Sequence, residues 1–90
     1  MKFGIIFELS VPRPFDEGVE KMVFDNSLEQ ARLADELGFE SAWCVEHHFL
    51  EEYSHSSCPE MFLSACAATT KDIRLGFGIA TCVPALNHAV

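Results

Sequence analysis

Three short apolar runs, centred about 35 residues apart, most strongly constrain how this 90-residue chain can fold. Residues 2–9 (KFGIIFEL), 41–49 (SAWCVEHHF) and 73–83 (IRLGFGIATCV) have the length and composition of buried β-strands. Helical signals fill the segments between them. The order strand, helix, strand, helix, strand predicts parallel strands, because a helical crossover returns the chain to the starting edge of the sheet.

The first helix is predicted from Asp25 to Leu37, where apolar and polar residues separate onto two faces. Ser27 and Gln30 have the spacing of a capping box, with neighbouring acidic and amide residues as alternative caps. Gly38 predicts a helix end in the left-handed conformation. The predicted apolar face consists of Leu28, Ala31, Ala34 and Leu37.

A second helix is predicted from Ser57 to about Thr70. Ser57 precedes Glu60 by three residues, as in a capping box, and Pro59 suits a first helical turn. Residues 61–68 (MFLSACAA) are apolar on nearly every side. We therefore expect this helix to pack between neighbouring elements.

The predicted elements are too few for either parallel α/β architecture that fits their order. Eight such units would need roughly 250 residues, as in a TIM barrel, and an open flavodoxin-like sheet also needs more than three strands. With 49% hydrophobic residues, the chain is apolar for a lone domain of its size. We expect residues 1–90 to be part of one larger α/β domain.

Charge and cysteine usage exclude several classes of partner. The net charge is −8 and no Lys/Arg cluster occurs, which argues against nucleic acid or an anionic membrane as a partner. There is no signal-peptide pattern and no C-x-x-C pair, so we expect a cytoplasmic protein with reduced thiols. Three of the four cysteines lie in apolar runs and are expected in the core: Cys44, Cys66 and Cys82.

Glu46, His47 and His48 lie at the carboxyl end of the second strand, where parallel α/β folds bind ligands. Side chains alternate along a strand, so His47 on the inner face would leave Glu46 and His48 on the other. An imidazole at this position can exchange a proton near neutral pH. For an isolated strand-end histidine, a simple hydrogen bond to a loop carbonyl is the commoner role.

Other kinds of site are weakly supported. Adjacent histidines on a strand diverge, and the first strand carries no histidine, so no metal site is expected and the acidic loop 51–57 is interpreted as surface or a lid. Gly76 and Gly78 lie inside a strand and form no dinucleotide fingerprint, although they allow close approach of another backbone or a ligand. Trp43 is expected to fill the interior of the fold rather than to stack on a ligand.

Residues 37–43 (LGFESAW) and 45–49 (VEHHF) resemble the second-strand signature of the bacterial luciferase-like, flavin-dependent monooxygenases. The similarity extends over essentially the whole chain, and Glu-His-His-Phe is its specific part. The resemblance implies a (β/α)₈ TIM barrel of which only the first three strands and two helices are present. It also implies an enzyme that uses reduced FMN, supplied by a flavin reductase, and O₂ to oxygenate a small organic substrate.

The resemblance further implies roles for individual residues. His47 would be the catalytic residue that manages protons, supported from outside by Glu46 and His48. The flavin would rest at the end of the third strand, against a non-proline cis peptide at Gly78–Ile79. Glu8, at the inward end of the first strand, is expected on the substrate side.

Two departures from the family pattern lie near the expected flavin contact: Phe77 stands where histidine is frequent, and Ala89 where proline is usual. The deazaflavin F420 is the alternative cofactor, although the histidine pair favours FMN. The family's phosphate-binding loops would follow later strands, so the 90-residue chain alone is expected to bind FMN poorly and to be inactive. A non-catalytic piece that acts only in association is a further alternative, and the parent protein is expected to be dimeric.

Overall fold

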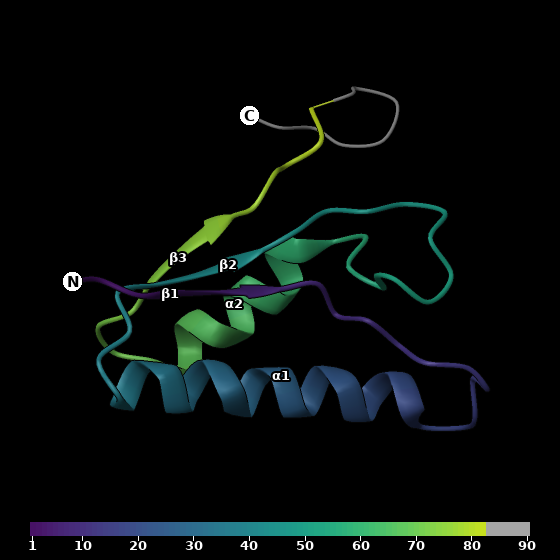
Figure 1. Ribbon diagram of the computed structural model, residues 1–90, viewed down its shortest axis with the longest axis horizontal. Helices are drawn as coiled ribbons and strands as arrows, with labels where there is room; N and C mark the ends of the chain where they lie inside the picture. The colour runs from purple at the N-terminus through teal and green to yellow at the C-terminus, as the bar shows by residue number, and fades with distance from the viewer. Residues whose placement is uncertain (83–90) are drawn as a thin grey trace.

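A computed structural model describes residues 1–82 as a parallel three-stranded sheet with two helices on one of its faces (Figure 1). The order of elements and the parallel pairing are as predicted, and β2 lies between the other two strands. In chain order the elements are β1 (Gly4–Phe7), α1 (Val19–Glu36), β2 (Ser41–Cys44), α2 (Pro59–Thr69) and β3 (Arg74–Phe77).

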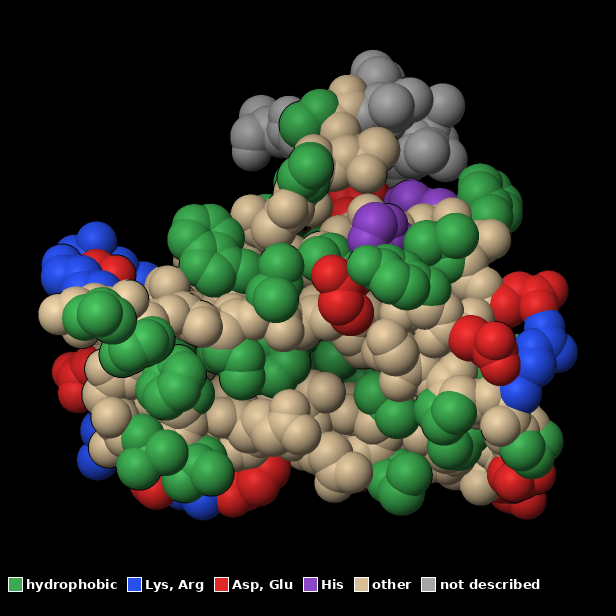
Figure 2. Space-filling view, viewed as in Figure 1, with side chains coloured by type: hydrophobic (Ala, Val, Ile, Leu, Met, Phe, Trp, Pro, Cys, Tyr) green, Lys and Arg blue, Asp and Glu red, His purple; other side chains and the backbone are tan. Residues whose placement is uncertain are grey.

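The pleat of the sheet separates a helix-covered face from a helix-free face. Phe7 pairs with Cys44, and both side chains are buried against the helices. Ile6 pairs with Trp43 on the opposite face, where their exposed fractions are 56% and 44%. The helix-free face therefore carries large apolar side chains that the described residues leave open (Figure 2).

The core lies between the sheet and the two helices. Phe7 and Phe62 pack edge to face with ring centroids 5.2 Å apart. Cys44 and Cys66 are buried as predicted, and burial raises the pKa of both thiols, that of Cys66 to about 11. The prediction for Cys82 is wrong: it is exposed, because β3 ends at Phe77 and the following segment leaves the sheet.

Helix α1 begins earlier than the capping-box pattern indicated. Its N-cap is Gly18, with φ of 81° and no side-chain cap, so Asp25 lies inside the helix and the Ser27 cap is wrong. Ser27 is buried in the helix together with Ala31 and Ala34. A glycine cap carries no side-chain signal, which is why the pattern missed it.

The carboxyl end of α1 is as predicted. Gly38 has φ of 83°, its N–H donates to the Asp35 carbonyl, and the Phe39 N–H donates to the Ala34 carbonyl. These are the two hydrogen bonds of a Schellman motif. Leu37 precedes this turn and is 66% exposed, so it does not join the buried face as expected.

Helix α2 covers the sheet with one face only. Its N-cap is Cys58 rather than Ser57, and it makes no side-chain capping bond, while Pro59 occupies the first turn as predicted. Phe62 faces the core, whereas Met61 is 70% exposed. The expected packing on both sides is therefore absent among the residues described here.

Asp35 of α1 fixes the turn between α2 and β3. Its carboxylate accepts hydrogen bonds from the backbone N–H groups of Lys71, Asp72 and Ile73 at 2.8 to 2.9 Å. These hydrogen bonds, that of Asp72 first, lower the pKa of the Asp35 carboxyl. One side chain thus sets where β3 starts relative to α1. In the described part of the chain, neither helix has the length and apolarity needed to cross a membrane.

Candidate functional site

The loops that follow β1 and β2 lie side by side at the carboxyl edge of the sheet (Figure 1). The Val11 N–H donates to the Glu52 carbonyl at 3.0 Å, and the His55 N–H donates to the Leu9 carbonyl at 2.9 Å. Arg13 adds ion pairs to Glu51 and Glu52. The two loops therefore form one connected rim.

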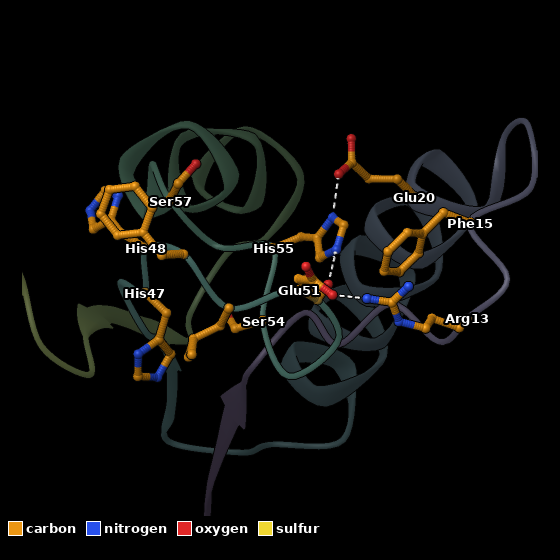
Figure 3. Close-up of a pocket in the computed structure, with 11 residues that line it drawn as sticks. Arg13, Phe15, Glu20, His47, His48, Glu51, Ser54, His55 and Ser57 are labelled. Atoms are coloured by element: carbon orange, nitrogen blue, oxygen red, sulfur yellow. Dashed lines mark hydrogen bonds and ion pairs between the residues drawn. The ribbon is translucent and has the colours of Figure 1, made fainter.

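This rim surrounds an open groove of about 680 Å³ (Figure 3). Polar and aromatic side chains share its lining. The five carboxylate and imidazole groups in it come from α1 and from the loop after β2, and the loop after β1 adds a guanidinium and a phenyl ring. Lining residues include Arg13, Phe15, Glu20, His47, His48 and His55.

His47 and His48 point to opposite sides of the chain after β2, as strand alternation predicted (Figure 3). The backbone N–H of His47 donates to the Ser56 carbonyl at 2.8 Å, which fixes its position against the loop. Its ring meets the edge of the Tyr53 ring, with centroids 5.6 Å apart. Nε2 of His47 lies 3.5 Å from Oε2 of Glu8, so two of the predicted site residues come together.

Glu46 and His48 form a second pair on the other side. The Glu46 side chain is 2% exposed and lies 2.8 Å from Nε2 of His48 through Oε1. Its Oε2 accepts a hydrogen bond from the Thr81 N–H at 2.7 Å. The bonds to His48 and to Thr81 lower the pKa of the Glu46 carboxyl. Glu46 thereby ties the end of β2 to the segment that follows β3.

The segment after β3 starts at Gly78, whose N–H donates to the Cys44 carbonyl at 2.7 Å. The predicted cis peptide at Gly78–Ile79 is wrong: among the described residues the cis bond is Arg13–Pro14. A non-proline cis bond costs about 3 kcal/mol and needs surrounding structure to hold it. Ile79 is 73% exposed, so the residues that the structure describes give it no such support. The family departure at Ala89 lies outside the described residues.

Sequence reasoning missed His55, which holds the groove together. Its Nδ1 lies 2.5 Å from Oε2 of Glu20 at the start of α1, and its Nε2 lies 2.6 Å from the Glu51 carbonyl. The ring also packs edge to face on Phe15. These partners are distant in sequence, so no local pattern signals the contact.

Two residues at the rim have backbones in the left-handed region. Leu9 has φ of 54° and is buried, and Phe49 has φ of 63° and is 96% exposed. Such conformations are uncommon outside glycine and concentrate at functional sites. Across residues 1–82, no three His, Cys, Asp or Glu side chains gather in a way that could hold a metal ion.

Comparison with known proteins gives one consistent result. A family model described as luciferase-like monooxygenase matches residues 1–89. The uncharacterized protein y4vJ of Sinorhizobium fredii is 46% identical over 57 residues, which is 63% of this chain and 16% of that protein. The oxygenase component of flavin-dependent trigonelline monooxygenase from Acinetobacter baylyi is 28% identical over 78 residues, which is 87% of this chain and 21% of that protein.

A solved structure shares the fold. It is the oxygenating constituent of 3,6-diketocamphane monooxygenase from Pseudomonas putida, a type II Baeyer-Villiger monooxygenase in complex with FMN. The TM-score is 0.72 and the identity 28%, over 86% of this chain and 20% of that one. The expected first three strands and two helices of a luciferase-like TIM barrel are thus confirmed. The chain spans only 14% to 20% of the length of three curated relatives that it matches.

Proposed function

The chain belongs to the luciferase-like monooxygenase family, and from that membership we propose that it supplies the first part of a barrel that uses reduced FMN and O₂ to oxygenate an organic substrate. The observation that carries the proposal is the position of His47, at the carboxyl end of β2 and on the helix-free side of the sheet. That edge is where barrel enzymes bind substrates and cofactors.

The helix-free face fits a flavin in two respects. A flavin is a flat ring system with apolar faces and a polar edge, and Ile6, which is 56% exposed and lies beside Gly78, offers an apolar surface at that edge. At the end of the same face, Oε2 of Glu8 is buried and has no hydrogen-bond partner among the described residues. Gly78 and Ile79 follow β3 at this edge and are the proposed cofactor contacts. When bound, FMN would supply the redox chemistry with O₂.

The chain's own residues would position groups and move protons around that cofactor. His47 is held by its backbone bond to Ser56 and keeps its ring 36% exposed toward the open side. An imidazole placed this way can give or take a proton at neutral pH. Glu46, bonded to His48 and Thr81, would hold the segment after β3 at a fixed distance from His47.

The relatives support the choice of cofactor and reductant. The Pseudomonas putida protein is an FMN complex, which favours FMN over the alternative F420. The Acinetobacter baylyi protein is described as an oxygenase component, which supports a separate flavin reductase as the electron source. Within this proposal the 90-residue chain does not turn over substrate alone, because barrel phosphate sites are usually built from later strands.

The proposal is tested in a protein of the relatives' length that begins with this chain, called here the family-length protein. Reduced FMN and reduced F420 are titrated separately, and turnover is screened with trigonelline and 3,6-diketocamphane. We expect FMN binding, and we expect His47→Ala to lower kcat by about 10² to 10⁴ if the imidazole does acid–base work. Binding of F420 without FMN would select the alternative, and an unchanged kcat in His47→Ala would remove the catalytic role.

The matched control for that substitution is Glu40→Gln. Glu40 pairs with Lys2 at the opposite end of the sheet, and its exposed fraction of 36% equals that of His47. We expect this variant to keep the kcat of the unaltered protein. A loss in both variants would indicate general damage to the fold.

A further inference from the structure

Glu8 and His47 are brought together by the parallel register of β1 and β2. Phe7 and Cys44 pair as the last residues of their strands, so the residues that follow them, Glu8 and His47 included, emerge at the same edge of the sheet. Glu8 and His47 both point to the helix-free side, with the whole Glu8 side chain 33% exposed and Nε2 of His47 3.5 Å from its Oε2. Both groups therefore sit at the edge that the proposed function assigns to the cofactor.

The Glu8 carboxylate lacks a hydrogen-bond donor. Its Oε2 is buried and accepts no hydrogen bond from the residues that the structure describes. A buried carboxylate oxygen without a donor is costly, and native proteins nearly always supply one. The side-chain nitrogen found opposite this atom in residues 1–82 is Nε2 of His47, at 3.5 Å. Catalytic hydrogen bonds are often long before substrate binds and shorten in the complex.

We propose that Glu8 is a positioning residue for His47, a role that rests on the proposed function and adds to it. The carboxylate accepts a hydrogen bond from the protonated Nε2 and so fixes the tautomer of the ring. Nδ1 then carries the lone pair, which is the atom left to take a proton. The edge of Tyr53, 5.6 Å away between centroids, limits ring rotation on another side.

The same arrangement recurs in enzymes where a carboxylate holds a catalytic histidine in one tautomer. In those enzymes the carboxylate acts through the histidine and contacts no substrate. Glu8 has the geometry for this role because it directly follows β1, whereas His47 follows β2. The site then holds its histidine from two directions: the backbone bond to Ser56 and the side-chain contact to Glu8.

The test uses the family-length protein with ¹⁵N-labelled histidine. Glu8→Ala removes the acceptor, and Glu8→Leu removes it while filling a similar volume. We expect the His47 ring nitrogens to show one tautomer in the unaltered protein and a mixture in Glu8→Ala and Glu8→Leu. Glu40→Gln, a carboxylate of similar exposure at the other end of the sheet, should leave these resonances unchanged.

Kinetics provide the second readout. We expect Glu8→Ala and Glu8→Leu to lower kcat by about 10-fold or more while KM changes by less than about 2-fold, because tautomer control acts on proton transfer and not on binding. In a His47→Ala background, Glu8→Ala should cause no further loss. Full additivity of the two substitutions would overturn the proposal, since independent sites add.

The outcomes separate this inference from the proposed function. Unchanged His47 resonances in both Glu8→Ala and Glu8→Leu overturn the positioning role, whatever the activity of His47→Ala. If His47→Ala keeps full turnover and Glu8→Ala changes the His47 tautomer, the contact between Glu8 and His47 is supported. The catalytic role of His47 is then contradicted. A raised KM with unchanged kcat in Glu8→Ala would instead assign Glu8 to substrate binding, as the sequence suggested, and overturn the positioning role.

Discussion

Gly76 leaves room for the indole ring of Trp43 on the neighbouring strand. A Cβ at this position would lie 2.6 Å from Cζ3 of Trp43, closer than real Cβ contacts allow. The ring has little freedom to retreat, because its Nε1 donates to Ser41 at 3.0 Å. The sequence indicated close approach at this glycine, and the approaching group is a side chain rather than a backbone or a ligand.

Gly76→Ala is therefore expected to lower the free energy of unfolding by about 1 to 3 kcal/mol through overpacking. The measurement is urea unfolding of the family-length protein. Replacing Trp43 by Leu in the same protein should restore much of the loss. Gly78→Ala is the control, since a Cβ there would meet its neighbours at an ordinary 3.5 Å. Equal losses at both glycines would contradict the expectation.

What the sequence could foresee at the residue scale was limited to local geometry. The opposite directions of His47 and His48 follow from the period of a strand, and that prediction is confirmed. The contact between Glu8 and His47 depends on the register between two strands, which no local pattern contains. His55 was missed for the same reason, because its partner Glu20 belongs to α1.

Helix ends were predictable from the sequence where the residue type favours one particular backbone conformation. Gly38 signalled the end of α1 because only a left-handed residue completes its hydrogen bonds. The start at Gly18 carried no side-chain cap, and the first turns of α1 are held partly by Phe24 packing on Phe62 of α2. Tertiary contacts of this kind extend a helix beyond its local pattern.

The hydrogen bonds that the Asp35 carboxylate accepts before the start of β3 should make the free energy of unfolding depend on pH. The bonded carboxylate has a lowered pKa in the folded protein, relative to an ordinary value near 3.8. The contribution of this carboxylate to the free energy of unfolding is fully present at a pH above the ordinary pKa. It is lost as the pH falls through the lower pKa of the folded protein. We expect Asp35→Asn to unfold at a lower urea concentration than the unaltered protein at pH 7. The difference between their midpoint urea concentrations should become smaller below about pH 4.

That comparison is made by urea unfolding of the family-length protein at a series of pH values. Asp25→Asn is a suitable control, because Asp25 pairs with Lys21 within one exposed face of α1 and makes no bond to another element in residues 1–82. A gap between Asp35→Asn and the unaltered protein that stays constant from neutral to acidic pH would show that the charge of Asp35 is not what stabilises the turn.

At the scale of the whole molecule, the sheet is covered on one face and open on the other. Trp43, the one tryptophan of the chain, is 44% exposed on the open face. Strands β1 and β3 each have a neighbour on one side only among the described residues. In a completed barrel that face becomes the interior, which is filled by side chains.

We therefore expect Trp43 to be shielded from acrylamide in the family-length protein when any other tryptophans are replaced by phenylalanine. The control carries Trp43→Phe with Leu33→Trp, which moves the reporter to a residue of similar exposure, 48%, on the outer side of α1. Fluorescence of the control should be quenched readily. Equal quenching of both reporters would argue that this face of the sheet stays open to solvent.

The order of the elements and the family were predictable from the sequence because they rest on strand spacing and on the Glu-His-His-Phe motif. The inclusion of residues 1–90 in a single barrel domain stays a prediction, as do the dimer and the roles of the site residues. Packing on the outer side of α2 was misjudged, because an apolar helix does not reveal whether its neighbour lies in the same segment.

Side chains alternate between the two faces of the sheet from Trp43 onward, so the face that each residue occupies depends on the number of residues before it. Losing one residue, such as Val45, would turn His48 inward, send His47 outward and bring the Glu46 carboxylate to the open face. Losing two would restore the alternation while shortening the reach of the strand. Natural variants of this segment should therefore accept many exchanges of side chain but few length changes of a single residue.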